Sequence, residues 1–284
     1  MSEASKLDEQ ESAVDPNLYY NTNAPEIISE ELLPVIEKLG LVDNCRQLAT
    51  NGYTVIENVA SPEFNETFRN KILEMSSTGD QPMNMLLRED PIFCEAVLNP
   101  KLMAMAEFSV GKGFLISQVA ASVRPAGSPA MALHADSNWM PAPFPVHNML
   151  LTACWACDDF TKEKGSTMVI PGSQTLRRHP NKQETEALAG AIAIECPAGS
   201  VAMWDGNIWH GNWARKAAGE RVVSHITYTR LMCRQVEDYS ADADRLIEMY
   251  GQPMAQLMGR EDSLFGSNGF LYEHLSQTFN NAKR

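Results

Sequence analysis

The pattern of apolar and polar positions predicts that the chain begins with helices. Residues 31–50 carry apolar side chains at helical spacing, and residues 52–59 form a short β-rich run. A Ser-Pro pair opens the stretch 61–75, whose apolar periodicity predicts a capped helix with proline in its first turn. Residues 90–110 then predict two more short helices, broken at Pro100.

The pattern changes at about residue 114, where short β-rich runs alternate with Gly, Pro, Asn and Asp clusters. These runs cover residues 114–123, 149–160, 166–173, 191–206 and 221–232. Their spacing favours an antiparallel sandwich or barrel over βαβ units. Residues 181–190 predict a helix or long loop between strands, and helical periodicity returns over 243–259.

The chain of 284 residues is therefore expected to hold one domain over 29–284, with its β core at about 114–234 between helical N-terminal and C-terminal parts. Residues 1–28 are polar and lack the apolar segment of a signal peptide, which predicts a disordered or extended leader. This start, and the absence of any apolar run long enough for a membrane span, favour a cytoplasmic protein.

Charge and cysteine content narrow the possible partners. The net charge of −13 disfavours nucleic acid and anionic membrane surfaces. Six cysteines in a chain of this length do not indicate a disulfide scaffold. Cys154 and Cys157 have redox-motif spacing, but their segment reads as a strand, where residues three apart face opposite sides.

The candidate chemistry lies in "ALHADSNWM", where His134 stands two residues before Asp136. On a strand these side chains share a face, so they could bind one metal ion or form a hydrogen-bonded pair between strands. Two histidines and one carboxylate suit ferrous iron in oxygen-activating sites. His210 is the best third ligand, because it follows a strand and a turn-rich segment that could return to the mouth of the barrel.

Arg221 adds a second clue. It stands eleven residues after His210, at the start of the next β run. A guanidinium fixed inside a largely apolar barrel requires an anion, and a small dicarboxylate would provide one.

Taken together, these residues resemble the phytanoyl-CoA dioxygenase family of iron and 2-oxoglutarate dependent oxygenases. The resemblance spans about residues 45–235 and rests on the His-Ala-Asp motif, "WACDDFTKEKGSTMVIPGS", "PAGSVAMWDG", and His210 followed by "GNW" and Arg221. It implies a double-stranded β-helix, a jelly-roll and cupin-like core that is mostly β with flanking helices. One departure is "PGSQ" at 171–174, where many members read "PGSH"; that histidine is not a metal ligand.

By this resemblance His134, Asp136 and His210 would bind Fe(II), and Arg221 would hold the distal carboxylate of 2-oxoglutarate, with dioxygen as the other cosubstrate. Trp155 matches a tryptophan that borders the cosubstrate in the family. Gln118, sixteen residues before His134, stands where the family has another cosubstrate contact.

The loop after the metal motif supplies candidate substrate contacts. Asn138, Trp139 and Phe144, together with Trp213, are aromatic or polar residues that could line a largely apolar substrate or equally close the end of the barrel.

The resemblance thus implies a hydroxylase or related C–H oxidase acting on a small organic molecule. Relatives that halogenate replace the carboxylate ligand with a small residue, so Asp136 favours oxygen transfer. The alternative is a cupin-like metal-binding barrel with a non-oxygenase activity, which would not need Arg221.

The remaining histidines have simpler interpretations. His147, His179 and His274 are expected to be structural. His225 shares a strand face with Arg221, so it could line the cavity or belong to the core.

Overall fold

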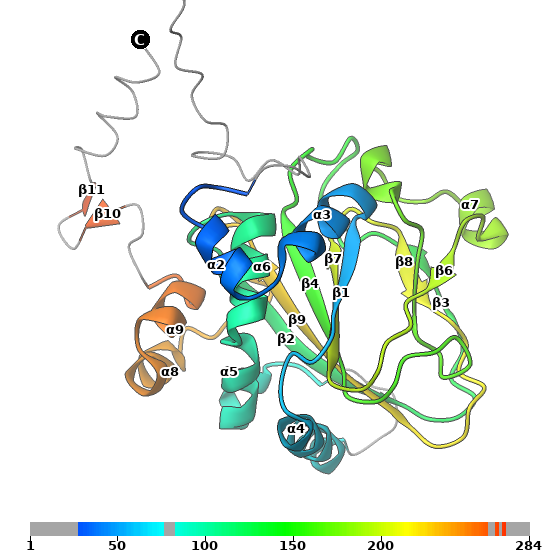
Figure 1. Ribbon diagram of the computed structural model, residues 1–284, viewed down its shortest axis with the longest axis horizontal. Coiled ribbons are helices and arrows are strands. Elements are labelled where there is room, and N and C mark those ends of the chain that lie inside the picture. The colour runs from blue at the N-terminus through cyan, green and yellow to red at the C-terminus, as the bar shows by residue number, and fades with distance from the viewer. Residues whose placement is uncertain (1–27, 77–82, 261–264, 267–268, 271–284) are drawn as a thin grey trace, which may run out of the picture.

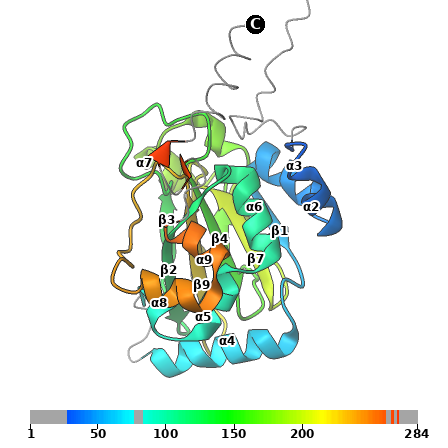
Figure 2. The same cartoon turned by 90° about the vertical axis from the view of Figure 1, so that its left-hand side faces the viewer.

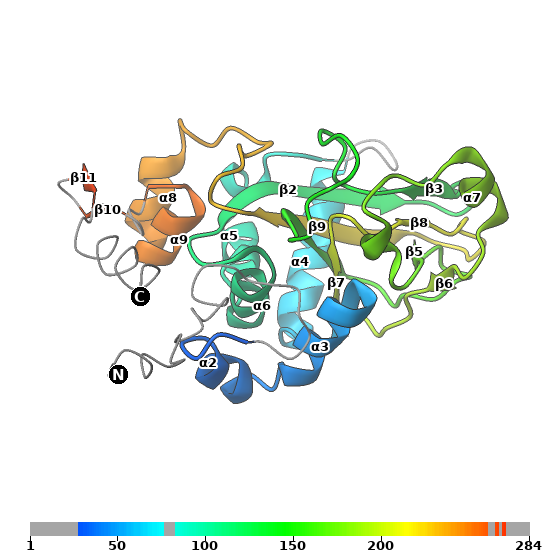
Figure 3. The same cartoon turned by 90° about the horizontal axis from the view of Figure 1, so that it is seen from above.

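The computed structural model describes residues 28–76, 83–260, 265–266 and 269–270. Its centre is a pair of antiparallel sheets, one five-stranded with the order β1-β7-β4-β9-β2 and one four-stranded with the order β3-β8-β5-β6. The two sheets face each other in the jelly-roll arrangement that the sequence predicted (Figure 3). The strands are β1 (Tyr53–Ile56), β2 (Leu115–Arg124), β3 (Met131–His134), β4 (Leu150–Ala156), β5 (Thr167–Val169), β6 (Ile192–Ala193), β7 (Ser200–Asp205), β8 (His210–Asn212) and β9 (Arg221–Thr229), with the separate pair β10 (Phe265–Gly266) and β11 (Gly269–Phe270).

Helices cover the outer face of the five-stranded sheet, while the four-stranded sheet lies on its other side (Figure 1). Seen from the helical side, α5, α6, α8 and α9 lie in front of the strands (Figure 2). The helices are α2 (Leu33–Lys38), α3 (Val42–Asn51), α4 (Pro62–Met75), α5 (Pro91–Val97), α6 (Pro100–Val110), α7 (Lys182–Ala187), α8 (Ala243–Tyr250) and α9 (Gln252–Leu257), with 3₁₀ turns at Leu86–Arg88 and Ser173–Leu176. In the described part of the chain, none of these helices combines the length and apolarity that a membrane span needs.

Alternation along the strands separates a helix-facing core from the space between the sheets. On β9, Val222, Ile226 and Tyr228 belong to the large apolar cluster that the helices share. Val223, from the opposite face of the same strand, belongs to a second cluster between the sheets. The inner face of the five-stranded sheet is thereby available for polar side chains that reach toward the four-stranded sheet.

Local sequence signals explain most element boundaries. The helix predicted from residue 62 is confirmed as α4, and the Ser61 hydroxyl accepts a hydrogen bond from Phe64 N at 3.2 Å. Pro100 begins α6, because proline fits the first helical position. The predicted leader falls outside the described residues except for residue 28, as does His274.

Candidate metal centre

His134 and His210 come from two adjacent short strands. His134 ends β3, His210 begins β8, and the two are direct partners in the antiparallel register. Their ring centroids are 4.4 Å apart. Gly211 permits this approach, since a Cβ atom there would collide with the carbonyl oxygen of Met131 on β3. A side chain at that position would push the strands apart and separate the two histidines.

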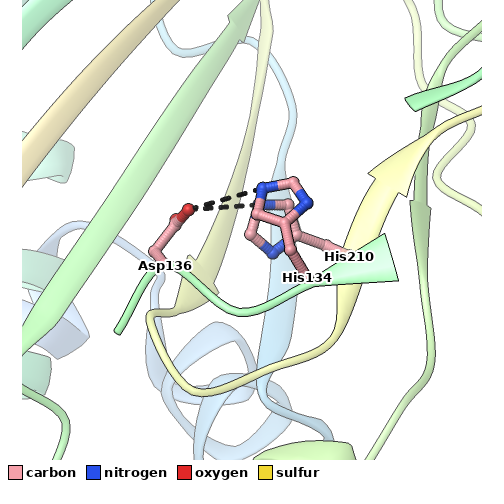
Figure 4. A group of neighbouring side chains, drawn as sticks. All are labelled: His134, Asp136 and His210. Atoms are coloured by element: carbon pink, nitrogen blue, oxygen red, sulfur yellow. Dashed lines mark ion pairs between the residues drawn. The ribbon is translucent and has the colours of Figure 1, made fainter. Parts of the chain in front are cut away.

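Asp136 completes the group from a bend just beyond β3. Its Oδ1 lies 3.4 Å from His210 Nε2 and 3.8 Å from His134 Nε2, and the three potential ligand atoms all lie within 4.8 Å of one another. Figure 4 shows the carboxylate pointing at both rings. The expectation that a continuous strand carries both His134 and Asp136 was wrong, because β3 ends at His134 and the bend aims the carboxylate.

Backbone carbonyls orient both imidazoles. His134 Nδ1 lies 3.0 Å from the carbonyl oxygen of Ala132, and His210 Nδ1 lies 3.2 Å from that of Ile208. These contacts assign the proton to Nδ1 in each neutral ring. The lone pair of each Nε2 is therefore available on the side that faces Asp136, as metal ligation requires.

The second carboxylate oxygen of Asp136 is held by the five-stranded sheet. Oδ2 accepts hydrogen bonds from Thr152 Oγ1 at 3.0 Å and from Trp204 Nε1 at 3.1 Å. The group thus joins both sheets, with histidines on one and the supports of the carboxylate on the other. Sequence reasoning missed both supports; Thr152 lies on the same β4 face as the inward Cys154, but no sequence signal singles out Trp204.

The electrostatics favour the ligating form of Asp136 and of His210. Burial would raise the pKa of Asp136, but the charges of His210 and His134 and the two hydrogen bonds lower it to below its usual value. Burial lowers the pKa of His210, against the opposing charge of Asp136. A carboxylate beside neutral imidazole is the donor set that a divalent transition metal binds.

A hydrogen-bonded network joins the bend that carries Asp136 to the turn that precedes His210. Ser137 Oγ donates to Asn207 Oδ1 at 2.6 Å, and Ser137 N donates to Gly206 O at 3.1 Å. Asn207 N in turn donates to the buried carboxylate of Asp205 at 2.7 Å. The spacing of the loops is therefore set by groups that do not face the metal position themselves.

Arg221 lies on the inner face of β9 and is 1% exposed. One guanidinium nitrogen donates to the carbonyl oxygen of Gly165, and the group lies 5.2 Å from the ring centroid of Phe160. Its Nε has no hydrogen-bond partner among the described residues. Burial lowers the pKa of Arg221 to about 10, and the neighbouring charges of Arg124 and Arg215 act in the same direction. This surplus of buried positive charge suits an anionic ligand.

Gln118 lies on the same inner face, on β2. It is the register partner of Thr227, which pairs with Thr152 on the next strand. Its Nε2 donates to Asn84 Oδ1 at 3.1 Å. Gln118 therefore belongs to the wall that also supports Asp136, and its contact with the cosubstrate stays a prediction.

Trp155 lies away from the metal centre, so the prediction that it borders the cosubstrate is wrong. Strand alternation puts it on the face of β4 opposite to Thr152, where it packs against Phe64 and Phe68 of α4 and donates to Asn65 Oδ1 at 3.1 Å. It is fully buried in the helix-facing core, so it does not border the metal centre.

Two of the expected substrate contacts lie in or against an apolar cluster. Phe144 is 1% exposed and packs with Leu133, Met168 and Trp209 in a cluster on the outer side of the four-stranded sheet. Trp213 packs against the same cluster, with Lys162 Nζ 4.0 Å from its ring centroid. The substrate-lining prediction is wrong for Phe144, because the same residue types fill cores and line pockets; for Trp213, which is only partly buried, it stays a prediction.

The other two expected contacts stand in the turn directly after the metal motif. Asn138 is exposed, and its N donates to Asp136 O at 2.7 Å. Trp139 is 73% exposed. Their position beside Asp136 is compatible with a substrate contact, which stays a prediction.

The structure also places two other histidines and the cysteine pair that the sequence singled out. His179 packs edge-on against Phe144, with ring centroids 5.0 Å apart. Cys154 and Cys157 are free thiols that belong to different apolar clusters, so they do not form a redox pair. His225 is half-buried on the inner face of β9, and its ring centroid lies 6.2 Å from that of Trp204.

Comparison with known sequences gives a family match. The profile described as "Phytanoyl-CoA dioxygenase (PhyH)" matches residues 48–223. "Dioxygenase af480" of Aspergillus fumigatus is 27% identical over 154 residues, which cover 54% of this chain and 49% of that protein. The uncharacterized protein Rv1501 of Mycobacterium tuberculosis is 22% identical over 165 residues, which cover 55% and 58%. The match thus spans about half the length of these curated relatives.

Comparison with solved structures agrees on the fold. HygX of Streptomyces hygroscopicus, crystallised with nickel and 2-oxoglutarate, superposes with a TM-score of 0.58 at 15% identity and covers 74% of this chain and 90% of its own. EctD of S. alaskensis, in its apoform, gives a TM-score of 0.58 at 18% identity and covers 77% and 82%. At these identities the comparison establishes the shared fold.

Proposed function

The chain belongs to the phytanoyl-CoA dioxygenase family, and from this premise we propose that it is an Fe(II) and 2-oxoglutarate dependent oxygenase. It couples oxidative decarboxylation of 2-oxoglutarate to hydroxylation, or a related C–H oxidation, of a small and largely apolar organic molecule. The cytoplasmic location favoured by the sequence is part of the same proposal.

The donor set fits the metal. His134, Asp136 and His210 offer two neutral imidazole nitrogens and one carboxylate oxygen, converging on one point from one side. When bound there, ferrous iron supplies the activation of dioxygen that the protein's own side chains cannot perform. The protein holds these three side chains in position. The carbonyls of Ala132 and Ile208 orient the two imidazole rings. Thr152 and Trp204 donate hydrogen bonds to the second oxygen of Asp136.

Arg221 is the single observation that most favours an oxygenase over a cupin-like metal protein. A buried guanidinium with an unused donor, on the inner face of the sheet that supports Asp136, has the charge and geometry to hold a distal carboxylate. The metal alone would not need it, because Asp136 already supplies the anionic ligand. The proposal therefore assigns 2-oxoglutarate to the space between the metal and Arg221.

The substrate approaches from the turn after Asp136 in this proposal. Trp139 presents an exposed indole there, and Asn138 offers an amide beside it. The solved complex of HygX with hygromycin B shows that a related fold accepts a small molecule, which supports a small-molecule substrate here.

Two measurements test the proposal. The metal-loaded protein should bind 2-oxoglutarate in a calorimetric titration, and it should release succinate only when both iron and 2-oxoglutarate are present. A protein that binds metal, does not bind 2-oxoglutarate and forms no succinate with any substrate of a broad panel would instead be the cupin-like alternative.

A further inference from the structure

A second side chain able to donate a hydrogen bond to a ligand lies on β9 between Arg221 and the metal centre. Strand alternation places Arg221, Val223 and His225 on the inner face, while Val222 and Ile226 pack toward the helices. Val223 is apolar, so His225 is the next polar side chain along this face after Arg221.

The described residues around His225 offer no hydrogen-bond partner to its ring nitrogens. Its register partners on the neighbouring strands are Ala120 and Cys154, which offer a methyl group and a thiol. Trp204 meets it edge to face, at 70°. The imidazole makes no hydrogen bond with any residue that the structure describes, although it is only half-buried on a face turned toward the other sheet. A histidine needed only to fill space would be replaceable by an apolar ring at lower desolvation cost.

Two neighbours locate His225 between the metal centre and Arg221. Trp204 contacts both His225 and His210, with ring centroids 6.2 Å and 4.9 Å away, and its indole N–H donates to Asp136. On the other side, Arg221 lies four residues back along the same face and its charge acts on His225. A molecule that extends from Arg221 to the metal must pass along this imidazole.

We propose that His225 binds 2-oxoglutarate, donating a hydrogen bond from its ring to a carboxylate oxygen of the cosubstrate, which lies between the Arg221 anchor and the metal. This inference rests on the proposed function and adds a cosubstrate-binding residue to it. The acceptor is a carboxylate oxygen at one end of the dicarboxylate, because the two middle carbons of 2-oxoglutarate are methylenes that accept no hydrogen bond.

The test compares two replacements in the full chain loaded with zinc, which keeps the metal redox-inert. His225→Phe keeps an aromatic ring and removes the donor, whereas His225→Gln keeps an N–H donor. Titration calorimetry should show 2-oxoglutarate binding weakened roughly 10- to 100-fold in His225→Phe, the loss expected for one hydrogen bond to a charged group. His225→Gln should recover most of that affinity, and zinc affinity should stay unchanged in both.

His179→Phe is the matched control, because His179 also meets an aromatic ring edge-on but packs on the outer side of the four-stranded sheet. It should bind 2-oxoglutarate like the wild type. Equal affinities in His225→Phe and the wild type would overturn the inference, as would equal losses in the Phe and Gln variants. If the wild type itself binds no 2-oxoglutarate, the proposed function fails instead.

A second measurement covers the case in which His225→Phe does not fold. In ¹⁵N-histidine-labelled wild-type protein, the ring signals of His225 are identified by their loss in His225→Gln. Adding 2-oxoglutarate to the zinc-loaded protein should shift these signals, as a new hydrogen bond requires. Saturation with 2-oxoglutarate without such a shift would exclude the contact.

Discussion

The indole N–H of Trp204 donates to Asp136 Oδ2 at 3.1 Å, on the side of the carboxylate away from the two histidines. This contact crosses from β7 of the five-stranded sheet to the bend after β3 of the four-stranded sheet. The metal centre is therefore held between two rigid sheets rather than on one loop, and precise ligand geometry depends on such support.

Trp204→Phe tests this support directly. The variant keeps an aromatic ring against His210 but removes the donor to Asp136. We expect metal affinity to fall at least about 10-fold, as is usual when a hydrogen bond to a ligand is lost. Competition titration with a chromophoric chelator measures this. Trp209→Phe is the control: its indole donates to Arg178 O at 2.7 Å, so its loss should leave metal affinity unchanged. Equal effects of the two variants would contradict the role of Trp204.

Asp136→Ala removes a ligand rather than its support. We expect metal affinity to fall by more than about 100-fold, beyond the range for a supporting contact, while the protein stays folded. Metal content after gel filtration, together with circular dichroism, checks both points. Asp159→Ala removes a surface carboxylate paired with Lys164 and should retain the metal. Unchanged metal content in Asp136→Ala would refute the ligand assignment.

Arg221→Met should separate cosubstrate binding from metal binding. Without the guanidinium, 2-oxoglutarate affinity should fall by about 100-fold, because a charge-assisted pair of hydrogen bonds is lost. Arg221→Lys should recover little, since an ammonium group cannot form the bidentate pair. Calorimetry on metal-loaded protein measures both. Arg178→Met, which removes a guanidinium paired with Glu184 at the surface, should bind 2-oxoglutarate normally. Wild-type affinity in Arg221→Met would rule out the anchor.

Much of the fold could be predicted because local signals agree with the tertiary packing. Ser61 caps α4 and Pro100 starts α6, each for a reason visible in a few neighbouring residues. The strands β3 and β8 could not be delimited, because they are four and three residues long. Runs this short carry too little periodicity to show where a strand ends, and the end of β3 decides how Asp136 is aimed.

The site could be predicted only for residues whose type and spacing in the sequence both match a metal site. His134, Asp136 and His210 combine residue types that a metal requires, so the sequence identifies them. Trp155 was misplaced because the face of a strand depends on register, and one step along β4 moves a side chain from the cavity to the helices. Thr152 and Trp204 act through hydrogen bonds made across the two sheets, which no local pattern encodes.

Asp205 should give the protein a pH-dependent stability. Burial raises the pKa of its carboxyl to about 7 from 3.8, against the hydrogen bond from Asn207 and the charge of Arg230. Between these values the folded protein holds a proton that the unfolded chain has lost. Stability should therefore fall as pH rises through this range, by about 4 kcal/mol in all.

Asp205→Asn removes this titration and keeps an oxygen that can accept from Asn207 N. The free energy of unfolding, measured by urea denaturation at pH 5 and pH 8, should depend less steeply on pH in the variant. Other groups titrate equally in both proteins, so the difference between the two profiles isolates Asp205. Parallel profiles would show that the carboxyl keeps an ordinary pKa.

Two aromatic residues of the loop after the metal motif should have different roles, Phe144 in stability and Trp139 in substrate binding. Phe144 is 1% exposed in the outer cluster of the four-stranded sheet, so Phe144→Ala should destabilise the protein by about 3 to 5 kcal/mol. In the folded fraction its affinities for metal and 2-oxoglutarate should stay at the wild-type level. Trp139 is 73% exposed, so Trp139→Ala should cost less than about 0.5 kcal/mol of stability.

The effect of Trp139→Ala should appear in the Michaelis constant of the organic substrate, because the indole offers apolar surface beside Asp136 without touching the metal ligands. Succinate release at saturating 2-oxoglutarate and varied substrate concentration measures this. Phe144→Ala, assayed well below its unfolding temperature, serves as the matched aromatic deletion from the same loop. A raised Michaelis constant for Phe144→Ala, with an unchanged one for Trp139→Ala, would reverse the division. The substrate would then have to reach the metal from the outer side of the four-stranded sheet, where Leu133, Met168 and Trp209 already fill the space around Phe144.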